Sequence, residues 1–307
     1  MAQTIPFGSL STADQVLAGV DLRRRRIVVT ECNSGIGFAT MEALSANGAQ
    51  IIGLARTLDD AQAACNAAGR SVTPLSCTPT DPASVDAAVQ SMRELGPLDA
   101  VVINCPELRC FADHIAQFVL INRLSELVRS GTGRIVIGNN DNAKITRRRV
   151  EDVMYDNLGG ERLYDSNAFD GQAELATALF AMELSRRLDA RGVAVNSFHC
   201  GTTGNGSSRA QHLIQSIARH FTKSHARRAA TPALLAASPL VVGMTGEYWA
   251  NCQRSRGNPL RLDLGLAKRL WEVSAQIAAI VFGGTLPQAV SFRRDPLRSG
   301  TDLNTAE

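Results

Sequence analysis

The chain repeats one pattern along much of its length: a short apolar stretch with the composition of a buried strand, then a stretch with a helical pattern. The strand-like segments are residues 26–30, 50–55, 71–76, 98–103, 133–137 and 193–198, and the longest helical stretch is Asn167 to Leu188. Short apolar strands that alternate with helices are typical of a parallel sheet covered on both faces. The sequence therefore predicts a doubly wound α/β fold, with a ligand crevice beyond the carboxyl ends of the strands.

Size and composition agree with a single folded unit. The chain has 307 residues, of which 45% are hydrophobic, enough to bury a sizeable core. We expect residues 1–20 to form a lead-in segment, residues 21–283 the folded domain and residues 284–307 a flexible tail. The first segment lacks the pattern of a signal peptide, and no apolar run reaches the ~18–20 residues of a membrane helix. We therefore expect a cytoplasmic protein with no membrane partner.

Charge and cysteine content argue against several classes of function. The formal net charge of +3 is too small to indicate a nucleic-acid partner, and we interpret the arginine runs at 23–26 and 147–149 as solvated surfaces. The seven cysteines show neither a CxxC pair nor Cys/His zinc spacing, so no metal site is predicted. An odd number of cysteines in a cytoplasmic chain indicates free thiols.

Several segments together carry a family resemblance. They are residues 11–22, Asn33-Ser-Gly-Ile-Gly-Phe-Ala-Thr40, residues 178–188, Val195-Asn-Ser-Phe-His-Cys-Gly201 and residues 270–274. Through them the chain resembles the short-chain dehydrogenase/reductase family from about Ser11 to Ile280, and it is most similar to the retinol-dehydrogenase-like branch. The resemblance implies a Rossmann-like fold. In that family the fold supports hydride transfer with NAD(H) or NADP(H).

The cofactor motif that the resemblance implies is only partly present. The family's glycine-rich turn, Thr-Gly-x-x-x-Gly-x-Gly, lets bare backbone approach a diphosphate at a helix N-terminus. Here Gly35 and Gly37 keep their places, but Glu31 replaces the first glycine. A carboxylate about 5 Å from a diphosphate would cost on the order of 3 kcal/mol at an effective dielectric constant near 20. A Glu31 side chain that rotates into solvent would avoid this cost.

Other positions for the cofactor differ as well. The family's Asp after the third strand corresponds to Thr78, and its Asn-Ala-Gly turn after the fourth strand reads Asn104-Cys-Pro106. Proline fixes φ and removes an N–H donor from that turn. Arg56 resembles the residue that selects NADP, although a surface arginine capping the next helix explains it equally well. We therefore predict no cofactor, and NADP if any dinucleotide binds.

The family's catalytic tetrad is replaced throughout. The family's Asn, Tyr and Lys correspond to Asp113, Asp170 and Glu174, and its Ser corresponds to Asn140 or, as an alternative, to Asn139. None of Tyr155, Tyr164 and Tyr248 has a lysine four residues later, so no other tyrosine takes over. A free carboxylic acid is several pKa units too acidic to replace the activated tyrosine that protonates a ketone at pH 7. Family-type hydride transfer is therefore not expected.

Two kinds of function remain. In the first, the chain is a catalytically degenerate family member that serves as a binding or partner subunit, pairing with itself or with an active paralogue through the apolar face of the helix Asn167 to Leu188. A small molecule in the old substrate crevice is compatible with this role. In the second, Asp170 or Glu174 acts as acid/base in a cyclisation, isomerisation or dehydration. An NADP-dependent oxidoreductase of small carbonyl or alcohol substrates is a further alternative.

Thiols and an imidazole follow the predicted strands. Cys32, Cys105 and Cys200 come after the first, fourth and sixth strands, and His199 adjoins the last of them. We expect them near the floor or rim of the crevice. They could bind a metal or a thiol-reactive ligand, or they could fill space as small buried residues, since a free cysteine packs as a small hydrophobe. The second interpretation is the simpler one.

Overall fold

The protein is described here by a computed structural model covering residues 4–69, 72–104, 111–139, 166–200, 225–256 and 259–282. For residues 111, 166–174, 259 and 260 only the backbone is described. Cys105, Pro106, Asn140, Tyr155 and Tyr164 fall outside these ranges, as does the tail expected at 284–307.

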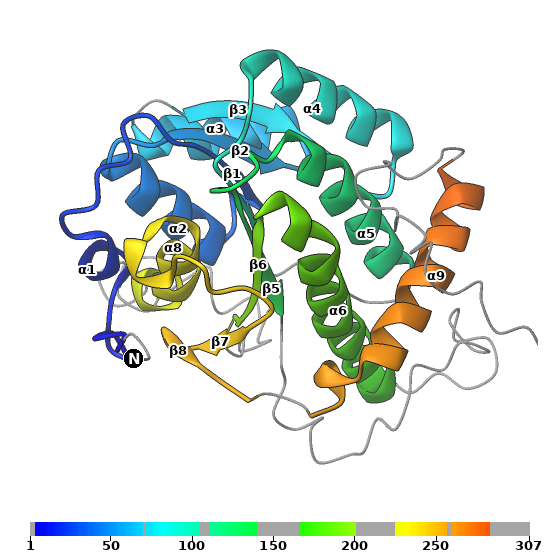
Figure 1. Ribbon diagram of the computed structural model, residues 1–307. Helices are drawn as coiled ribbons and strands as arrows, with labels where there is room; N and C mark the ends of the chain where they lie inside the picture. The colour runs from blue at the N-terminus through cyan, green and yellow to red at the C-terminus, as the bar shows by residue number, and fades with distance from the viewer. Residues whose placement is uncertain are drawn as a thin grey trace, which may run out of the picture.

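An eight-stranded sheet in the order β3-β2-β1-β4-β5-β6-β7-β8 forms the centre of the molecule (Figure 1). Its strands are β1 (Arg26–Thr30), β2 (Gln50–Ala55), β3 (Val72–Ser76), β4 (Ala100–Ile103), β5 (Arg134–Asn139), β6 (Ala194–His199), β7 (Tyr248–Ala250) and β8 (Gln253–Arg254). All neighbours pair in parallel except β7 and β8. The doubly wound α/β fold predicted from the sequence is confirmed, although β7 and β8 were not predicted.

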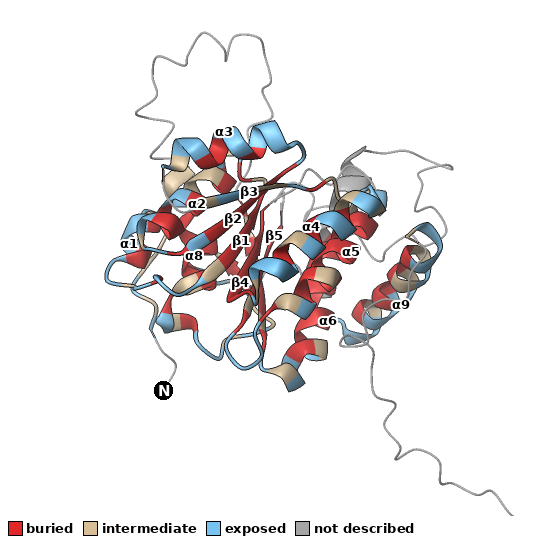
Figure 2. Ribbon diagram, turned by 90° about the horizontal axis from the view of Figure 1, so that it is seen from above, coloured by how far each residue is buried: buried red, intermediate tan, exposed pale blue. Residues whose placement is uncertain are grey.

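Helices cover both faces of this sheet (Figure 2). One face carries α1 (Ala13–Leu17), α2 (Gly35–Ala46), α3 (Leu58–Ala68) and α8 (Ala230–Ala237), and the other carries α4 (Pro82–Leu95), α5 (Phe111–Leu127), α6 (Ser166–Leu188) and α9 (Leu264–Val281). Side chains of a strand alternate between the two layers: Val28 belongs to the core under α4, α5 and α6, whereas Ile27 and Val29 belong to the core under α2 and α8. This alternation explains why the three central residues of β1, Ile27, Val28 and Val29, are all apolar.

The segment 1–20, which we expected to be a lead-in to the folded domain, contributes side chains to the hydrophobic core. Thr12 caps α1, because its side chain accepts a hydrogen bond from Gln15 N and Gln15 bonds back to the Thr12 backbone. Ala13, Val16 and Leu17 are buried against α2 and α8. The packed part of the chain therefore begins before residue 21. No helix in the described ranges is long and apolar enough to cross a membrane.

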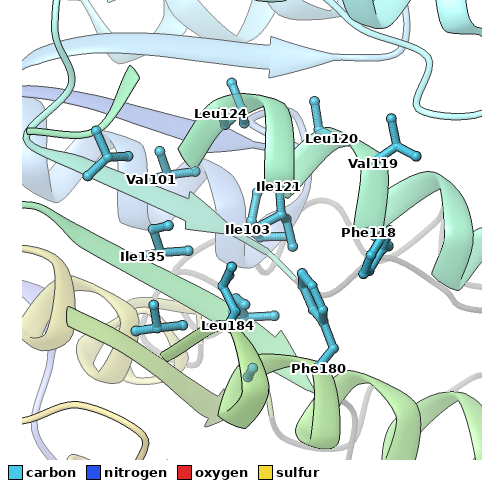
Figure 3. Close-up of a cluster of buried hydrophobic side chains, with 14 of the residues drawn as sticks. Val101, Ile103, Phe118, Val119, Leu120, Ile121, Leu124, Ile135, Phe180 and Leu184 are labelled. Carbon is cyan, nitrogen blue, oxygen red and sulfur yellow. The ribbon is translucent and has the colours of Figure 1, made fainter. Parts of the chain in front are cut away.

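Residues 175–188 of helix α6 are enclosed by their own chain. Between residues 175 and 188, Arg186 is the only exposed side chain. The predicted apolar face packs inward, and Figure 3 shows Phe180 and Leu184 turned toward α5 and the strands. On the outer side α9 lies across α5 and α6, with the Trp271 ring stacked on Phe180 at 5.6 Å and edge-on to Phe118 at 4.9 Å between ring centroids. The apolar face that suggested a dimer is thus satisfied inside one chain.

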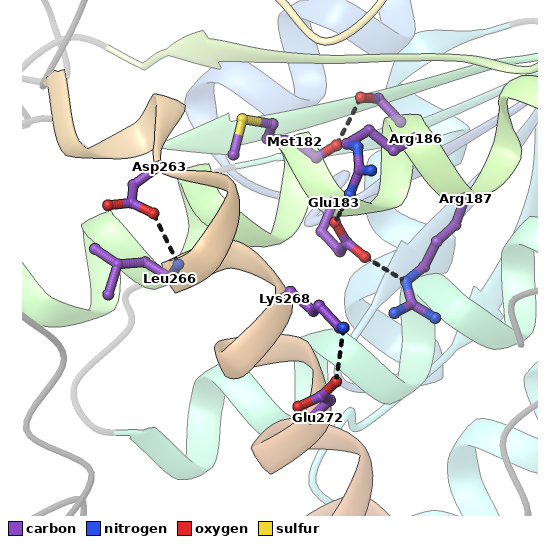
Figure 4. A network of polar contacts seen from close by, with 9 residues as sticks. Met182, Glu183, Arg186, Arg187, Asp263, Leu266, Lys268 and Glu272 are labelled. Carbon is purple, nitrogen blue, oxygen red and sulfur yellow. Dashed lines mark hydrogen bonds and ion pairs between the residues drawn. The ribbon is translucent and has the colours of Figure 1, made fainter. Parts of the chain in front are cut away.

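Polar contacts join the same three helices. Glu183, which has no exposed side-chain surface, accepts hydrogen bonds from Arg186 at 2.8 Å and from Arg187 at 2.9 Å (Figure 4). The guanidinium of Arg187 lies over the Trp271 ring, 4.1 Å from its centroid. On α5, His114 Nε2 lies 3.1 Å from Ser274 Oγ of α9. Complete burial lowers the pKa of His114 to about 4, so its ring is neutral at pH 7.

Candidate functional site

A cleft of about 630 Å³ opens at the carboxyl ends of β1, β2, β3 and β4. This is the end of a doubly wound sheet at which ligands bind, and the volume is that of a typical small-molecule site. The cleft is lined by Thr30, Glu31, Asn33, Ser34, Leu54, Ala55, Arg56, Asp60, Cys77, Thr78, Pro79, Thr80, Ile103, Asp113, Ala116, Gln117 and Leu120. The predicted crevice is therefore present, and Glu31, Arg56, Thr78 and Asp113 all line it.

Glu31 adopts the backbone conformation of a glycine. Its φ is +50°, in the left-handed region, which costs roughly 1–2 kcal/mol for a residue with a Cβ. The turn thus has the backbone shape that the first glycine of the family motif would allow, but in this chain a carboxylate occupies that position beside the cleft. Ser34 then caps α2, since its Oγ accepts from Gly37 N at 3.0 Å.

Packing inside the chain restricts the two retained glycines to different degrees. A Cβ on Gly37 would lie 2.0 Å from the Glu31 carbonyl oxygen, and a Cβ on Gly35 would lie 2.5 Å from His225 Nε2. The first contact is with backbone and excludes a Cβ, whereas the second is with the imidazole of His225, which would have to move to admit one. Gly37 is therefore explained without a bound phosphate, and its presence is not evidence for a dinucleotide.

Acidic side chains outnumber basic ones around the cleft. Among the described lining residues, Glu31, Asp60 and Asp113 are acidic and Arg56 is basic. His225 and Arg228 lie near the N-terminus of α2 but do not line the cleft, and burial together with the charge of Arg228 lowers the pKa of His225. The ring at this helix end is therefore mainly neutral at pH 7.

Two of the predicted cofactor positions have structural roles. Asn104 is buried, its side chain donates from Nδ2 to Thr30 O at 2.7 Å, and its backbone N–H donates to Thr30 Oγ1 at 3.0 Å. It therefore ties β4 to β1. Thr78 N donates to Ser84 Oγ at 2.9 Å, and the Thr78 hydroxyl lies 3.4 Å from Arg56 O. These contacts fix the turn after β3 against the end of β2.

The catalytic positions predicted from the sequence are only partly placed. Asp113 begins α5 at the wall of the cleft. Asp170 and Glu174 lie on α6, and Asn140 follows β5 outside the described residues. Tyr248, on β7, is buried beneath the guanidinium of Arg261, which lies 5.4 Å from its ring centroid. Tyr248 therefore sits in the core and not at the cleft.

The cysteines depart from expectation in two ways. Cys200 is in a disulfide, so the prediction that all the thiols are free is wrong. Cys32 lies in the core beneath the turn and does not line the cleft: a Cβ on Gly53 would be 3.2 Å from Cys32 Sγ and 2.9 Å from Cys65 Sγ. Burial raises the pKa of Cys32 to about 12. The space-filling interpretation suits Cys32, because the missing Cβ of Gly53 leaves room for both sulfurs.

His199, at the end of β6, is half-buried and does not line the cleft. Within the described ranges no group of three or more His, Cys, Asp and Glu side chains is arranged to hold a metal ion.

Gln117 was missed in the sequence. It lies one helical turn after Asp113 on α5 and lines the cleft with a side chain that is only 5% exposed. Neither its Nε2 nor its Oε1 has a hydrogen-bond partner. The signal that could have found it is its spacing: a residue four positions after Asp113 shares the same helix face.

Comparisons with known proteins agree with this architecture. The family model described as short chain dehydrogenase matches residues 25–113. A WW domain-containing oxidoreductase of Danio rerio is 30% identical over 297 residues, covering 86% of this chain and 70% of that protein. Human retinol dehydrogenase 14 is 27% identical over 297 residues, covering 84% of this chain and 87% of that protein.

A solved structure shares the fold at lower sequence identity. A short chain oxidoreductase of Pseudomonas aeruginosa PAO1, described as NADPH-bound and as containing an atypical catalytic center, is 21% identical with a TM-score of 0.53, covering 75% of this chain and 96% of that one. Together with the sheet order and the cleft at its carboxyl end, these likenesses identify the family. The chain belongs to the short-chain dehydrogenase/reductase family and resembles its retinol-dehydrogenase-like members.

Proposed function

We propose that this chain is a binding member of its family that does not carry out family-type hydride transfer, and that its cleft holds a small molecule other than a dinucleotide. The observation that carries the proposal is the charge of the cleft. Glu31 stands in the glycine-rich turn with left-handed backbone, and Asp60 and Asp113 line the same space with Arg56 as the one basic side chain among the described lining residues.

The sign of this charge opposes a dinucleotide. Each carboxylate about 5 Å from a diphosphate would weaken binding by on the order of 3 kcal/mol, roughly a hundredfold, at an effective dielectric constant near 20. Arg56 offsets part of this repulsion. The helix N-terminus, which normally favours an anion, here has Glu31 beside it. The cleft therefore suits an uncharged or cationic ligand better than a phosphorylated one.

The alternative is an NADP-dependent oxidoreductase. Arg56 favours it, since this guanidinium lines the cleft at the end of β2. The relatives named above are called oxidoreductase and dehydrogenase, and the Pseudomonas structure is described as NADPH-bound despite its atypical catalytic center. Whether a chain keeps the usual catalytic residues and whether it binds the nucleotide are thus two separate questions. For this reason the decisive experiment measures nucleotide binding directly.

Calorimetric titration with NADPH and with NADH tests the proposal. We expect no binding with a dissociation constant below about 10 µM, which corresponds to roughly −7 kcal/mol. Glu31→Gln, which removes the charge, should tighten NADPH binding, and Glu31→Gly, which removes the whole side chain from the turn, should tighten it further. Asp14→Asn, at an exposed position on α1, is the control and should change nothing. Micromolar or tighter binding by the unmodified protein would contradict the proposal.

A further inference from the structure

A second pocket, of about 410 Å³, lies at the opposite end of the sheet from the cleft. It opens at the amino ends of β1, β4, β5 and β6, against the end of α8 and the chain that follows it. Much of its wall is apolar: Leu22, Ile27, Ala236 and Val241 are buried, and Val242, which also lines it, is 67% exposed. The volume falls within the range of small-molecule sites.

One basic side chain of this pocket, Arg134, is only half satisfied by the protein. Its Nη1 donates to Leu235 O at 3.2 Å and to Ser238 O at 2.8 Å, which caps the C-terminal end of α8. Within the described residues its Nε and Nη2 have no hydrogen-bond partner, and neither belongs to the buried unpaired atoms, so both keep surface that solvent reaches. Arg191, by contrast, uses Nε, Nη1 and Nη2 on acceptors of its own chain.

The charge of Arg134 also lacks a counter-ion. No carboxylate among the described residues lies within ion-pair distance of its guanidinium. Asp99 lines the same pocket, but its Oδ1 pairs with Arg25 Nη1 at 3.0 Å and with Arg129 Nε at 3.3 Å. Burial, together with the charge of Arg25, lowers the pKa of Arg134 to about 10, which leaves its guanidinium charged at pH 7. A charged group that has lost water without gaining a partner favours an anion beside it.

The open part of Arg134 determines which anion fits. Nε and Nη2 form one edge of the planar guanidinium, and their N–H bonds match the two oxygens of a carboxylate. We propose that this pocket binds a monocarboxylate with a small apolar body, whose oxygens accept from Nε and Nη2 of Arg134 while its body lies against the apolar wall. A doubly charged phosphate ester fits less well, because Asp189 also lines the pocket and Arg25 already pairs with Asp99. The site is separate from the cleft and does not depend on what binds there.

Cyclohexanecarboxylate, cyclohexanecarboxamide and cyclohexyl phosphate make a matched set of probes, because they share one ring and differ in the group that would meet Arg134. At pH 7 we expect ligand-observed NMR to show the carboxylate binding about tenfold more tightly than the amide, and more tightly than the phosphate ester. In the unmodified protein the carboxylate should also shift the Nε–H resonance of Arg134 and the methyl resonances of Val242. This second readout does not depend on a substituted chain folding.

Substitutions separate the paired edge from charge alone. Arg134→Lys keeps the positive charge but loses the planar pair of donors, so it should weaken carboxylate binding by about tenfold. Asp189→Asn, at an exposed position, removes a repelling charge and should tighten carboxylate binding without changing that of the amide. Arg24→Lys is the control, since Arg24 is exposed and does not line the pocket. It should leave the affinities of all three probes unchanged.

The contrary outcomes are equally definite. Equal binding of carboxylate and amide, or an Arg134 Nε–H resonance that does not move at saturating carboxylate, would mean that water alone solvates the open edge, and would overturn the inference. Full carboxylate affinity in Arg134→Lys would overturn it as well. Tightest binding by the phosphate ester would show that the ligand class is wrong. None of these results bears on the proposed function, which the NADPH titration tests separately.

Discussion

Buried thiols lie beneath the glycine-rich turn and along the neighbouring strands. Cys32 and Cys65 meet around Gly53, and Cys77 lies at the end of β3, where burial raises its pKa to about 11. Burial also raises the pKa values of Cys65 and Cys252. A thiolate is the reactive form of cysteine, so these thiols should be inert in the folded protein.

We predict that iodoacetamide at pH 8 leaves Cys32, Cys65, Cys77 and Cys252 unmodified in the folded protein and labels all four in guanidinium chloride. Peptide mass spectrometry measures this. The raised pKa values also imply that stability falls above about pH 9, because the unfolded chain loses these protons first, and the effect is complete near pH 12. Rapid labelling of Cys32 without denaturant would show that the turn opens readily.

For individual residues, the sequence correctly predicted which side chains line the cleft, but it was less successful in predicting what each residue does. Glu31, Arg56, Thr78 and Asp113 line the cleft as expected, because each follows a strand or begins a helix at the carboxyl edge. The packing role of Gly35 could not be predicted, since it depends on His225, which is remote in sequence. The burial of Cys32 depends in the same way on Gly53 and Cys65. Such contacts are set by tertiary packing and not by local pattern.

Among the helices, α5, α6 and α9 form one packed unit. Phe118, Phe180 and Trp271 supply its aromatic centre, and Arg187, which donates to Glu183 on the same helix, lies over the Trp271 ring of α9. Burial lowers the pKa of Arg187, and the nearby Glu183 carboxylate opposes this effect. Removing one partner of a buried ion pair costs much more than removing one partner of an exposed pair.

We predict that Glu183→Ala lowers the free energy of unfolding by about 3 kcal/mol, because the largely buried Arg187 loses the carboxylate that neutralises it. Urea denaturation measures the change. Glu126→Ala is the matched control: Glu126 and its partner Arg93 are both exposed, their charged atoms lie 3.7 Å apart, and we expect a loss below about 1 kcal/mol. Similar losses for both variants would mean that the Glu183 network adds little.

The sequence predicted these elements unevenly. The ends of β1 and β2 agree with the prediction because apolar runs mark them locally. Strands β7 and β8 have three and two residues, too few for a pattern to show. The cover that α9 provides could not be predicted either. An apolar helix face looks the same whether a distant part of the chain or a second subunit buries it.

In the whole molecule the strand order explains where the cleft lies. The chain runs outward from β1 through β2 to β3, then crosses to β4 on the other side of β1 and continues to β7. The order therefore reverses between β1 and β4, and the cleft opens at their carboxyl ends. The alternation of strands and helices was sufficient to predict this arrangement.

We predict that amide hydrogen exchange in residues 175–188 does not change with protein concentration between about 0.1 and 50 µM, because contacts within one chain already enclose α6. Exchange in the exposed N-terminal part of α4 serves as the reference for solvent-accessible backbone. Slower exchange in α6 at high concentration would show that this helix forms an interface between chains.

The position of α9 late in the sequence also determines when its contacts with α5 and α6 can form during synthesis. Helix α6 ends at Leu188, but the helix that covers it begins only at Leu264. At synthesis rates of about 5–20 residues per second, several seconds pass between the two. Through that interval Phe118 and Phe180 lack the ring of Trp271 that completes their cluster. On the ribosome, the aromatic patch on α5 and α6 therefore remains uncovered until α9 emerges late in translation.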